Sequence, residues 1–139
     1  MSYAFTKIYE CIKKAVKAHN TETQISVSLT HTDKIIWMHM LSKYLSFKQS
    51  GNLYFETQEQ ISEATGTSIR ATKYSLRKLK HLGIFQSKKV HVEKHIFCTV
   101  YQNIYDPNEI HHLLLYDVHD KQIDKSSFKI TLTDPFLGK

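Results

Sequence analysis

The sequence predicts an α+β fold that is mostly helical, and three of its features lead to this prediction. Only four Gly and two Pro occur among 139 residues, so most of the chain should be regular secondary structure. Apolar residues recur at three- and four-residue steps in several segments and alternate with polar residues in others. The helical segments in the middle of the chain have helix-starting residues before them and helix-ending residues after them. A chain of this length with 41% hydrophobic residues is expected to form one compact unit.

The N-terminal segment, from about Tyr3 to His19, is expected to be a helix with one apolar face. The residues of that face are Phe5, Ile8, Tyr9, Ile12, Ala15 and Val16. This face exceeds what a small domain needs to cover, so it should pair with a second copy of the chain or with a C-terminal helix. The sequence thus predicts a homodimer with an interface formed by Phe5, Ile8, Tyr9, Ile12, Val16, Ile110, Leu113 and Leu114.

A strand and a long helix are expected next, after a polar linker at about 20–23. Residues 25–29 alternate between apolar and polar side chains, as in a short strand. Thr30 has the position of a helix N-cap because Asp33, three residues on, can return its hydrogen bond. The turn residues 50–52 end this helix, which should lie in the core because its apolar stripe is broad.

A short helix is expected after an extended segment at 53–55. Thr57 is its predicted N-cap, and Gln60 completes a capping box. Ile61 and Ala64 are expected to face the core from this helix.

A longer helix follows the turn at Gly66, starts at Thr67 or Ser68 and ends at Gly83. Its inward positions at helical spacing are Thr72, Ser75, Leu76, Leu79 and Leu82. This helix is therefore expected to bury one side and to offer the other side to solvent or to a partner.

A hairpin is expected after this helix. A strand begins at 84–85, a basic loop spans 87–94 and a second strand returns over 95–104. The buried members of the second strand are either Phe97 and Val100 or Cys98 and Tyr101, because the sequence allows both phases.

The C-terminal segment begins with strong helix-start residues. Asp106 is a cap, Pro107 has the first helical position and Glu109 completes the box, so a helix is expected up to about His119. Alternation at Phe128, Ile130 and Leu132 predicts a short strand in the tail.

These elements divide the compact unit into three parts. Residues 1–23 form an N-terminal helix for dimerisation or packing, residues 24–105 form the central domain, and residues 106–139 form a C-terminal helix and tail.

Composition argues against several classes of protein. No apolar run approaches membrane-spanning length and no signal peptide opens the chain, so a cytoplasmic protein without a membrane partner is expected. Cys11 and Cys98 fit neither a disulfide framework nor a paired metal site. No phosphate-cradling loop, nucleophile elbow or paired carboxylates occur, so we expect no enzyme, no cofactor and no small-molecule ligand. The spacing of His91, His95 and Cys98 suits a helix or knuckle rather than a hairpin, and no metal is expected.

Positive charge is concentrated in one segment of the chain. The net charge is +6 and the isoelectric point is about 9.2. Residues 67–95 hold eight Lys or Arg and one Glu, whereas residues 96–139 hold four Lys and six Asp or Glu. This distribution is that of an element that faces nucleic acid, although a solvated lysine-rich surface explains the charge alone equally well.

Residues 57–85, with the short helix, the turn at Gly66, the longer helix and the Leu82-Gly83-Ile84 exit, resemble the helix-turn-helix of winged-helix bacterial and phage DNA-binding proteins. The flanking helices resemble those of MarR-like dimeric regulators, and the centre is similar to the N-terminal domain of phage O-type and plasmid replication proteins. Thr72 and Ser75 depart from the pattern because aliphatic residues are usual there.

The resemblance implies that the longer helix enters the major groove of double-stranded DNA and that the hairpin forms a wing. Arg70, Lys73 and Tyr74 are expected at base edges, while Arg77, Lys78 and Lys80 suit phosphates. The full set of expected DNA-binding residues is Thr57, Gln58, Thr67, Ser68, Arg70, Ala71, Lys73, Tyr74, Arg77, Lys78, Lys88, Lys89 and Lys94.

Two roles follow from this resemblance, and the sequence does not separate them. The first is sequence-specific DNA binding in transcriptional regulation, and the second is replication initiation on a plasmid or phage. The alternative is a winged-helix module that binds another protein without DNA specificity.

Overall fold

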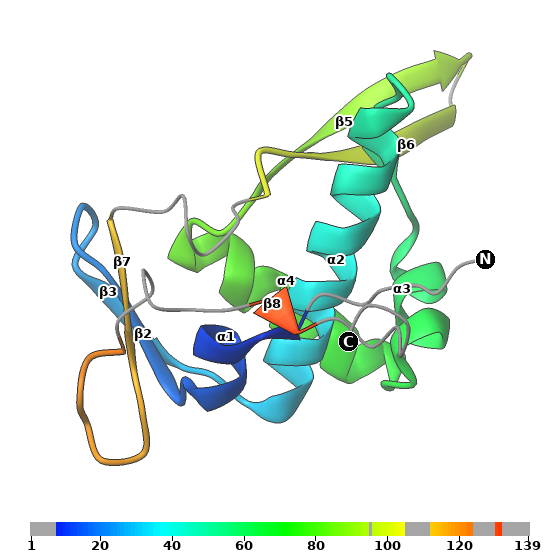
Figure 1. Ribbon diagram of the computed structural model, residues 1–139. Coiled ribbons are helices and arrows are strands. Elements are labelled where there is room, and N and C mark those ends of the chain that lie inside the picture. The colour runs from blue at the N-terminus through cyan, green and yellow to red at the C-terminus, as the bar shows by residue number, and fades with distance from the viewer. Residues whose placement is uncertain (1–7, 95, 105–111, 124–129, 132–139) are drawn as a thin grey trace.

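The computed structural model describes residues 8–94, 96–104, 112–123 and 130–131. Over these residues, helices α1–α4 combine with small antiparallel sheets, so the prediction of an α+β fold is confirmed. Figure 1 shows the longest helix, α2, in the middle of the molecule.

Helix α2 (His31–Gln49) packs against α3 (Gln58–Thr65) and α4 (Ile69–Leu82). It begins where the sequence predicts, because the Thr30 side chain accepts a hydrogen bond from the Asp33 amide and the Asp33 carboxylate accepts one from the Thr30 amide. Its buried apolar side chains are Ile36, Trp37, Met40 and Leu41. These side chains make α2 the central helix of the core.

The ends of α3 and α4 also follow the local signals in the sequence. Thr57 and Gln60 form a reciprocal capping box at α3, and Ser68, rather than Thr67, caps α4. Gly66 and Gly83 close the two helices in the left-handed conformation, with φ of 71° and 92°. The prediction that Ala64 faces the core is wrong: it is exposed, and Ile61 is the buried residue of this short helix.

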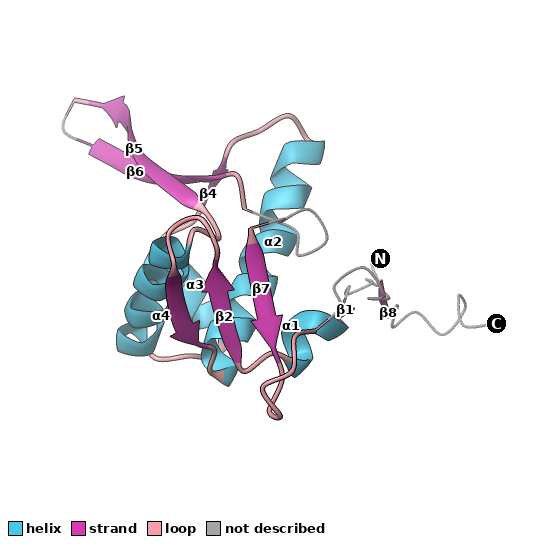
Figure 2. Cartoon of the chain, turned by 90° about the vertical axis from the view of Figure 1, so that its left-hand side faces the viewer, coloured by secondary structure: helices cyan, strands magenta, loops and turns pink. Residues whose placement is uncertain are grey.

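Two three-stranded antiparallel sheets lie on different sides of these helices (Figure 2). One has the order β3-β2-β7, with β2 (Lys17–Asn20), β3 (Ile25–Ser28) and β7 (Leu113–Tyr116). The other has the order β4-β6-β5, and its elements are β4 (Tyr54–Phe55), β5 (Gln86–Glu93) and β6 (Ile96–Gln102). The β5–β6 hairpin projects away from the helices (Figure 2).

A separate pair of short strands joins segments near the two ends of the chain. Strand β1 (Ile8–Tyr9) pairs with β8 (Ile130–Thr131) in antiparallel register. The predicted strand in the tail is therefore present at residues 130 and 131.

The prediction of one helix from Tyr3 to His19 is wrong over the described residues. Helix α1 covers only Glu10–Lys14, and residues 17–20 form β2. Strand β2 is the central strand of its sheet and pairs with both β3 and β7. Its backbone is satisfied on one side by the adjacent strand β3 and on the other by β7, which comes from a distant part of the chain, and this pairing overrides the local helical spacing.

The prediction of a helix up to His119 is wrong for the same reason. Residues 113–116 form β7, in which Leu113 and Leu115 are buried and alternate with half-buried neighbours. Val118, beyond the end of β7, is 72% exposed. The start predicted at Asp106 lies outside the described residues.

The predicted basic loop at 87–94 is instead the greater part of β5. Its pairing with β6 is continuous from Gln86 to His91 and shifts register before Glu93. Both Val100 and Tyr101 of β6 are buried, so neither of the two predicted burial phases holds alone. The turn comes later than predicted, and the basic residues lie on a strand rather than on a loop.

One hydrophobic core draws on residues from both ends of the described chain. Ile12 and Leu113 are buried in the same cluster as Trp37 and Leu79. Two of the residues predicted for the dimer interface therefore pack inside a single chain. Val16 and Leu114 are partly buried, and Phe5 and Ile110 lie outside the described residues, as do the side chains of Ile8 and Tyr9.

Replacing Gly83 by Ala should destabilise the fold more than the matched change Gly66→Ala. Both glycines have positive φ, so each substitution should cost ~1 kcal/mol or more in backbone strain. A Cβ at Gly83 would also lie 2.9 Å from Nδ2 of Asn20, whereas a Cβ at Gly66 meets nothing within 4 Å. Asn20 is only 3% exposed, so it has little room to move. Urea unfolding measures the two free energies, and equal losses would contradict this account.

Candidate nucleic-acid interface

Helix α4 has one buried face and one exposed basic face. The five predicted inward residues, Thr72, Ser75, Leu76, Leu79 and Leu82, are all buried, which confirms the predicted phase of the helix. Arg70, Lys73, Arg77 and Lys80 recur at three- and four-residue steps and are all exposed. We call these four residues the basic stripe. Their positive charges are thus held on one side of a helix that the core fixes in place.

The two polar residues on the buried face have specific partners. Thr72 Oγ1 lies 2.8 Å from the Ser68 carbonyl oxygen, to which it donates, and 2.6 Å from Thr67 Oγ1. Ser75 Oγ donates to Oδ1 of Asp33 on α2 at 2.5 Å. Their polarity, a departure from the usual pattern, is therefore explained by hydrogen bonds that join α4 to the preceding turn and to α2.

An internal ion pair fixes the same side of α4. Lys78 Nζ lies 2.7 Å from Oδ2 of Asp33 and donates to the Ser28 carbonyl at 3.0 Å. The Lys78 side chain is 11% exposed and that of Asp33 is fully buried. The prediction that Lys78 faces outward is therefore wrong, because its ammonium group neutralises a buried carboxylate.

The pKa of Asp33 shows how well this carboxylate is compensated. Burial alone would raise that pKa, since it removes the charged form from water. Hydrogen bonds from Lys78, Ser75 and the Thr30 amide, with the charge of Lys78, outweigh burial and hold the pKa below the ordinary value of 3.8. Asp33 is therefore ionised at neutral pH.

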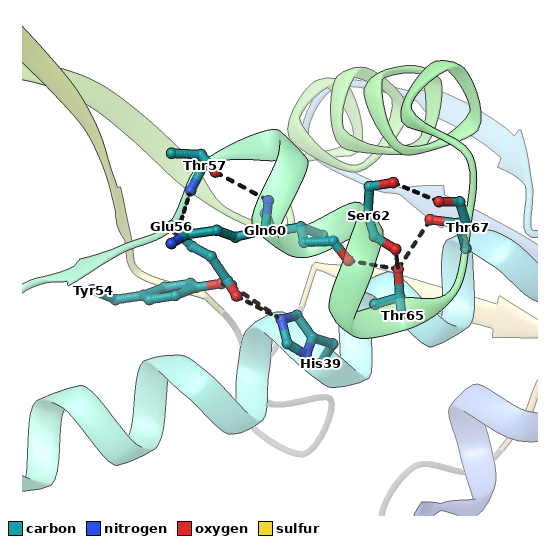
Figure 3. A network of polar contacts seen from close by, with 9 residues as sticks. His39, Tyr54, Glu56, Thr57, Gln60, Ser62, Thr65 and Thr67 are labelled. Carbon is teal, nitrogen blue, oxygen red and sulfur yellow. Dashed lines mark hydrogen bonds and ion pairs between the residues drawn. The ribbon is translucent and has the colours of Figure 1, made fainter.

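A second polar network fixes the start of α3 against α2 (Figure 3). Tyr54 donates its hydroxyl hydrogen to Oε1 of Glu56 at 2.5 Å, and Nε2 of His39 on α2 lies 3.0 Å from the same oxygen. Burial and the nearby Glu56 carboxylate raise the pKa of Tyr54, so its hydroxyl remains a donor. This network holds the segment that leads into Thr57, the N-cap of α3 (Figure 3).

The residues of α3, α4 and the turn between them that are predicted to contact DNA divide into partly buried residues and exposed residues. Thr67 is partly buried and hydrogen-bonded to Thr65 and Thr72, so it shapes the turn (Figure 3). Ser68 is exposed at the start of α4, where its hydroxyl caps the Ala71 amide. Thr57 is likewise exposed as the cap of α3, while Gln58 and Ala71 are partly buried. Tyr74, on the outer side of α4, is 60% exposed.

The β5–β6 hairpin adds further positive charge. Lys88, Lys89 and Lys94 are all exposed, and Lys94 lies at the turn with a positive φ of 41°. The His91 ring contacts the Lys94 carbonyl and packs on the ring of Phe97, with 4.9 Å between the ring centroids. The three predicted lysines are therefore exposed on a hairpin whose end is stabilised by the contacts of His91.

A groove of about 580 Å³ separates α4 from this hairpin. It is lined by basic residues of α4, by the start of α3 and by strands β4 and β6, and its lining residues include Lys73, Arg77, Lys80, Glu59, Phe55 and Phe97. Phe55 and Phe97 are 54% and 56% exposed. Sequence reasoning missed these two phenylalanines and Glu59, because spacing along the chain does not reveal which apolar residues remain in solvent.

Two further features are absent from the described residues. There, no group of three His, Cys, Asp or Glu side chains is arranged to hold a metal ion. None of the helices in this part of the chain has both the length and the apolar character needed to cross a membrane.

Comparison with protein-family models gives no match for this sequence, and comparison with curated proteins gives none either.

Replacing Asp33 by Asn should lower the free energy of unfolding at neutral pH by about 3 kcal/mol, because it leaves the Lys78 charge without its counter-ion. The folded-state pKa of Asp33 is depressed, so its stabilisation is present above the unfolded pKa of 3.8 and is lost as the pH falls through the lower, folded pKa. The variant should therefore lose less stability than the wild type as the pH falls from the unfolded pKa of 3.8 through the folded pKa. Chemical unfolding at several pH values tests this, with exposed Glu63→Gln as the control. Equal pH dependence in both variants would contradict it.

Proposed function

We propose that this chain is a winged helix-turn-helix protein that binds double-stranded DNA in a sequence-specific manner through α4. The observation that carries the proposal is the basic stripe, which stands exposed on a helix whose opposite face is buried and ion-paired. A helix that enters the major groove needs this division between a fixed face and a free face.

The order of elements around the stripe supports the same proposal. A helix (α2), a strand (β4), two helices (α3 and α4) and a hairpin (β5–β6) follow one another, and the hairpin pairs with β4 in one sheet. This order is the one expected of a helix-turn-helix with a wing. Lys88, Lys89 and Lys94 on that hairpin are suited to phosphates or to an adjacent groove.

The side chains of α4 suggest how DNA recognition divides along the helix. Arg70, Lys73 and Tyr74 lie in its N-terminal half and are assigned to base edges, where Arg can bind guanine with two hydrogen bonds. Arg77 and Lys80 lie further along and are assigned to phosphates. Thr57 stands where the amides at the start of α3 can approach the DNA backbone.

The proposed biological role is transcriptional regulation or replication initiation, and it rests only on the resemblance to winged-helix DNA-binding proteins. The homodimer stays a prediction. Because Ile12 and Leu113 fill the core of a single chain, a dimer would have to use other residues.

The double variant R70A/K73A should abolish sequence-specific binding while the fold remains intact. Selection of bound duplexes from a random pool identifies the target, and fluorescence anisotropy then measures affinity over a range of salt concentrations. The residual, non-specific binding should keep a steep salt dependence, of about 0.9 in log–log slope per neutralised phosphate, because Arg77 and Lys80, which are assigned to phosphates, remain.

The matched control is K14A/K43A, which removes the same charge from exposed positions on α1 and α2. This control should retain both the target preference and most of the affinity. Unchanged binding by R70A/K73A, or an equal loss in the control, would refute the assignment of α4. If the chain instead binds another protein, with an affinity that depends little on salt, the alternative of a winged-helix protein-interaction module is favoured.

A further inference from the structure

We propose that the groove between α4 and the β5–β6 hairpin receives one unpaired, unstacked base of the bound DNA. This inference rests on the proposed DNA-binding function and adds to it the recognition of one unpaired base beside the paired DNA. The protein would then prefer a duplex that contains an unpaired nucleotide over a fully paired duplex.

The two walls of the groove differ in chemistry. On one wall, Lys73, Arg77 and Lys80 come from successive turns of α4. On the other wall, Phe55 on β4 and Phe97 on β6 present aromatic rings, each more than half exposed. A cationic track beside aromatic rings is the arrangement that binds unpaired nucleic acid, because phosphates and base faces are held separately.

The acidic residues at the groove do not cancel the positive charge of the wall formed by α4. Both Glu56 oxygens lie within hydrogen-bond distance of His39 Nε2, one of them also accepts from Tyr54, and the side chain is only 11% exposed. Glu59 is exposed in the first turn of α3 and also lines the groove. A free carboxylate repels phosphate but accepts hydrogen bonds from the amino group of cytosine or adenine. It therefore favours a nucleotide with its phosphate toward α4 and its base toward the hairpin.

The aromatic wall distinguishes an unpaired base from a paired one. In a duplex, each base face is covered by its neighbours, so an aromatic side chain gains access only where a base has left the stack. The groove volume of about 580 Å³ lies within the range of pockets that enclose small organic ligands. The exposure of two phenylalanines, which is costly in water, is explained by a stacked base.

The probes for the test are two duplexes of about 20 base pairs, or two helical turns, that carry the selected target sequence. One is fully paired, and the other contains a single extra cytosine, whose amino group can donate to Glu59. Fluorescence anisotropy gives the ratio of the two affinities for each protein. The wild type should bind the bulged duplex about tenfold more tightly, and Phe97→Leu should abolish that ratio, because one base–aromatic stack contributes that much. Phe97→Tyr should keep the ratio, since it retains the ring.

The matched control is Val92→Ala, an exposed apolar residue on the same hairpin that is 59% exposed and does not line the groove. It should leave the ratio unchanged, and thermal unfolding verifies that every variant is folded. A wild-type ratio near one, or a ratio that Phe97→Leu leaves intact, would overturn the groove inference and leave duplex binding standing. Absence of binding to the paired duplex would refute the proposed function itself, whatever the bulged duplex does.

Discussion

The buried carboxylate of Asp33 is the constraint on which the arrangement of the helices depends. This one residue caps α2 through the Thr30 amide, accepts the Ser75 hydroxyl and pairs with Lys78. A charge removed from water requires nearly complete compensation, so these partners must all lie within a few ångströms of it. Asp33 therefore acts together with the buried leucines of α4 to fix the rotation of this helix about its axis, and that rotation determines which side chains face outward.

The local signals of the sequence predicted the centre of the fold well and its flanks poorly. Caps at Thr30, Thr57 and Ser68 act within three residues, so their effect could be inferred from neighbours alone. Strands β2 and β7 depend on each other across about a hundred residues. Nothing in either segment reveals its partner, and the alternation of Leu113 and Leu115 was hidden by helix-start residues just before it.

The candidate interface shows the same division between local and distant information. The buried face of α4 followed from its spacing, and so did the exposure of Arg70, Lys73 and Arg77. Lys78 was misassigned because its counter-ion, Asp33, comes from another helix. The aromatic wall was missed because exposure of Phe55 and Phe97 depends on how β4 and β6 stand beside α4.

Asn20 joins the C-terminal end of α4 to the β3-β2-β7 sheet. Its side chain donates to the Leu82 carbonyl at 2.8 Å and accepts from the amides of Glu22 and Thr23 in the β2–β3 turn. With Asp33 bound to the middle of the helix and Asn20 to its C-terminal end, α4 is attached at two places to the first 33 residues of the chain. Local opening of α4 must then disrupt the β2–β3 turn as well, so their amide hydrogens should exchange with solvent as one cooperative unit.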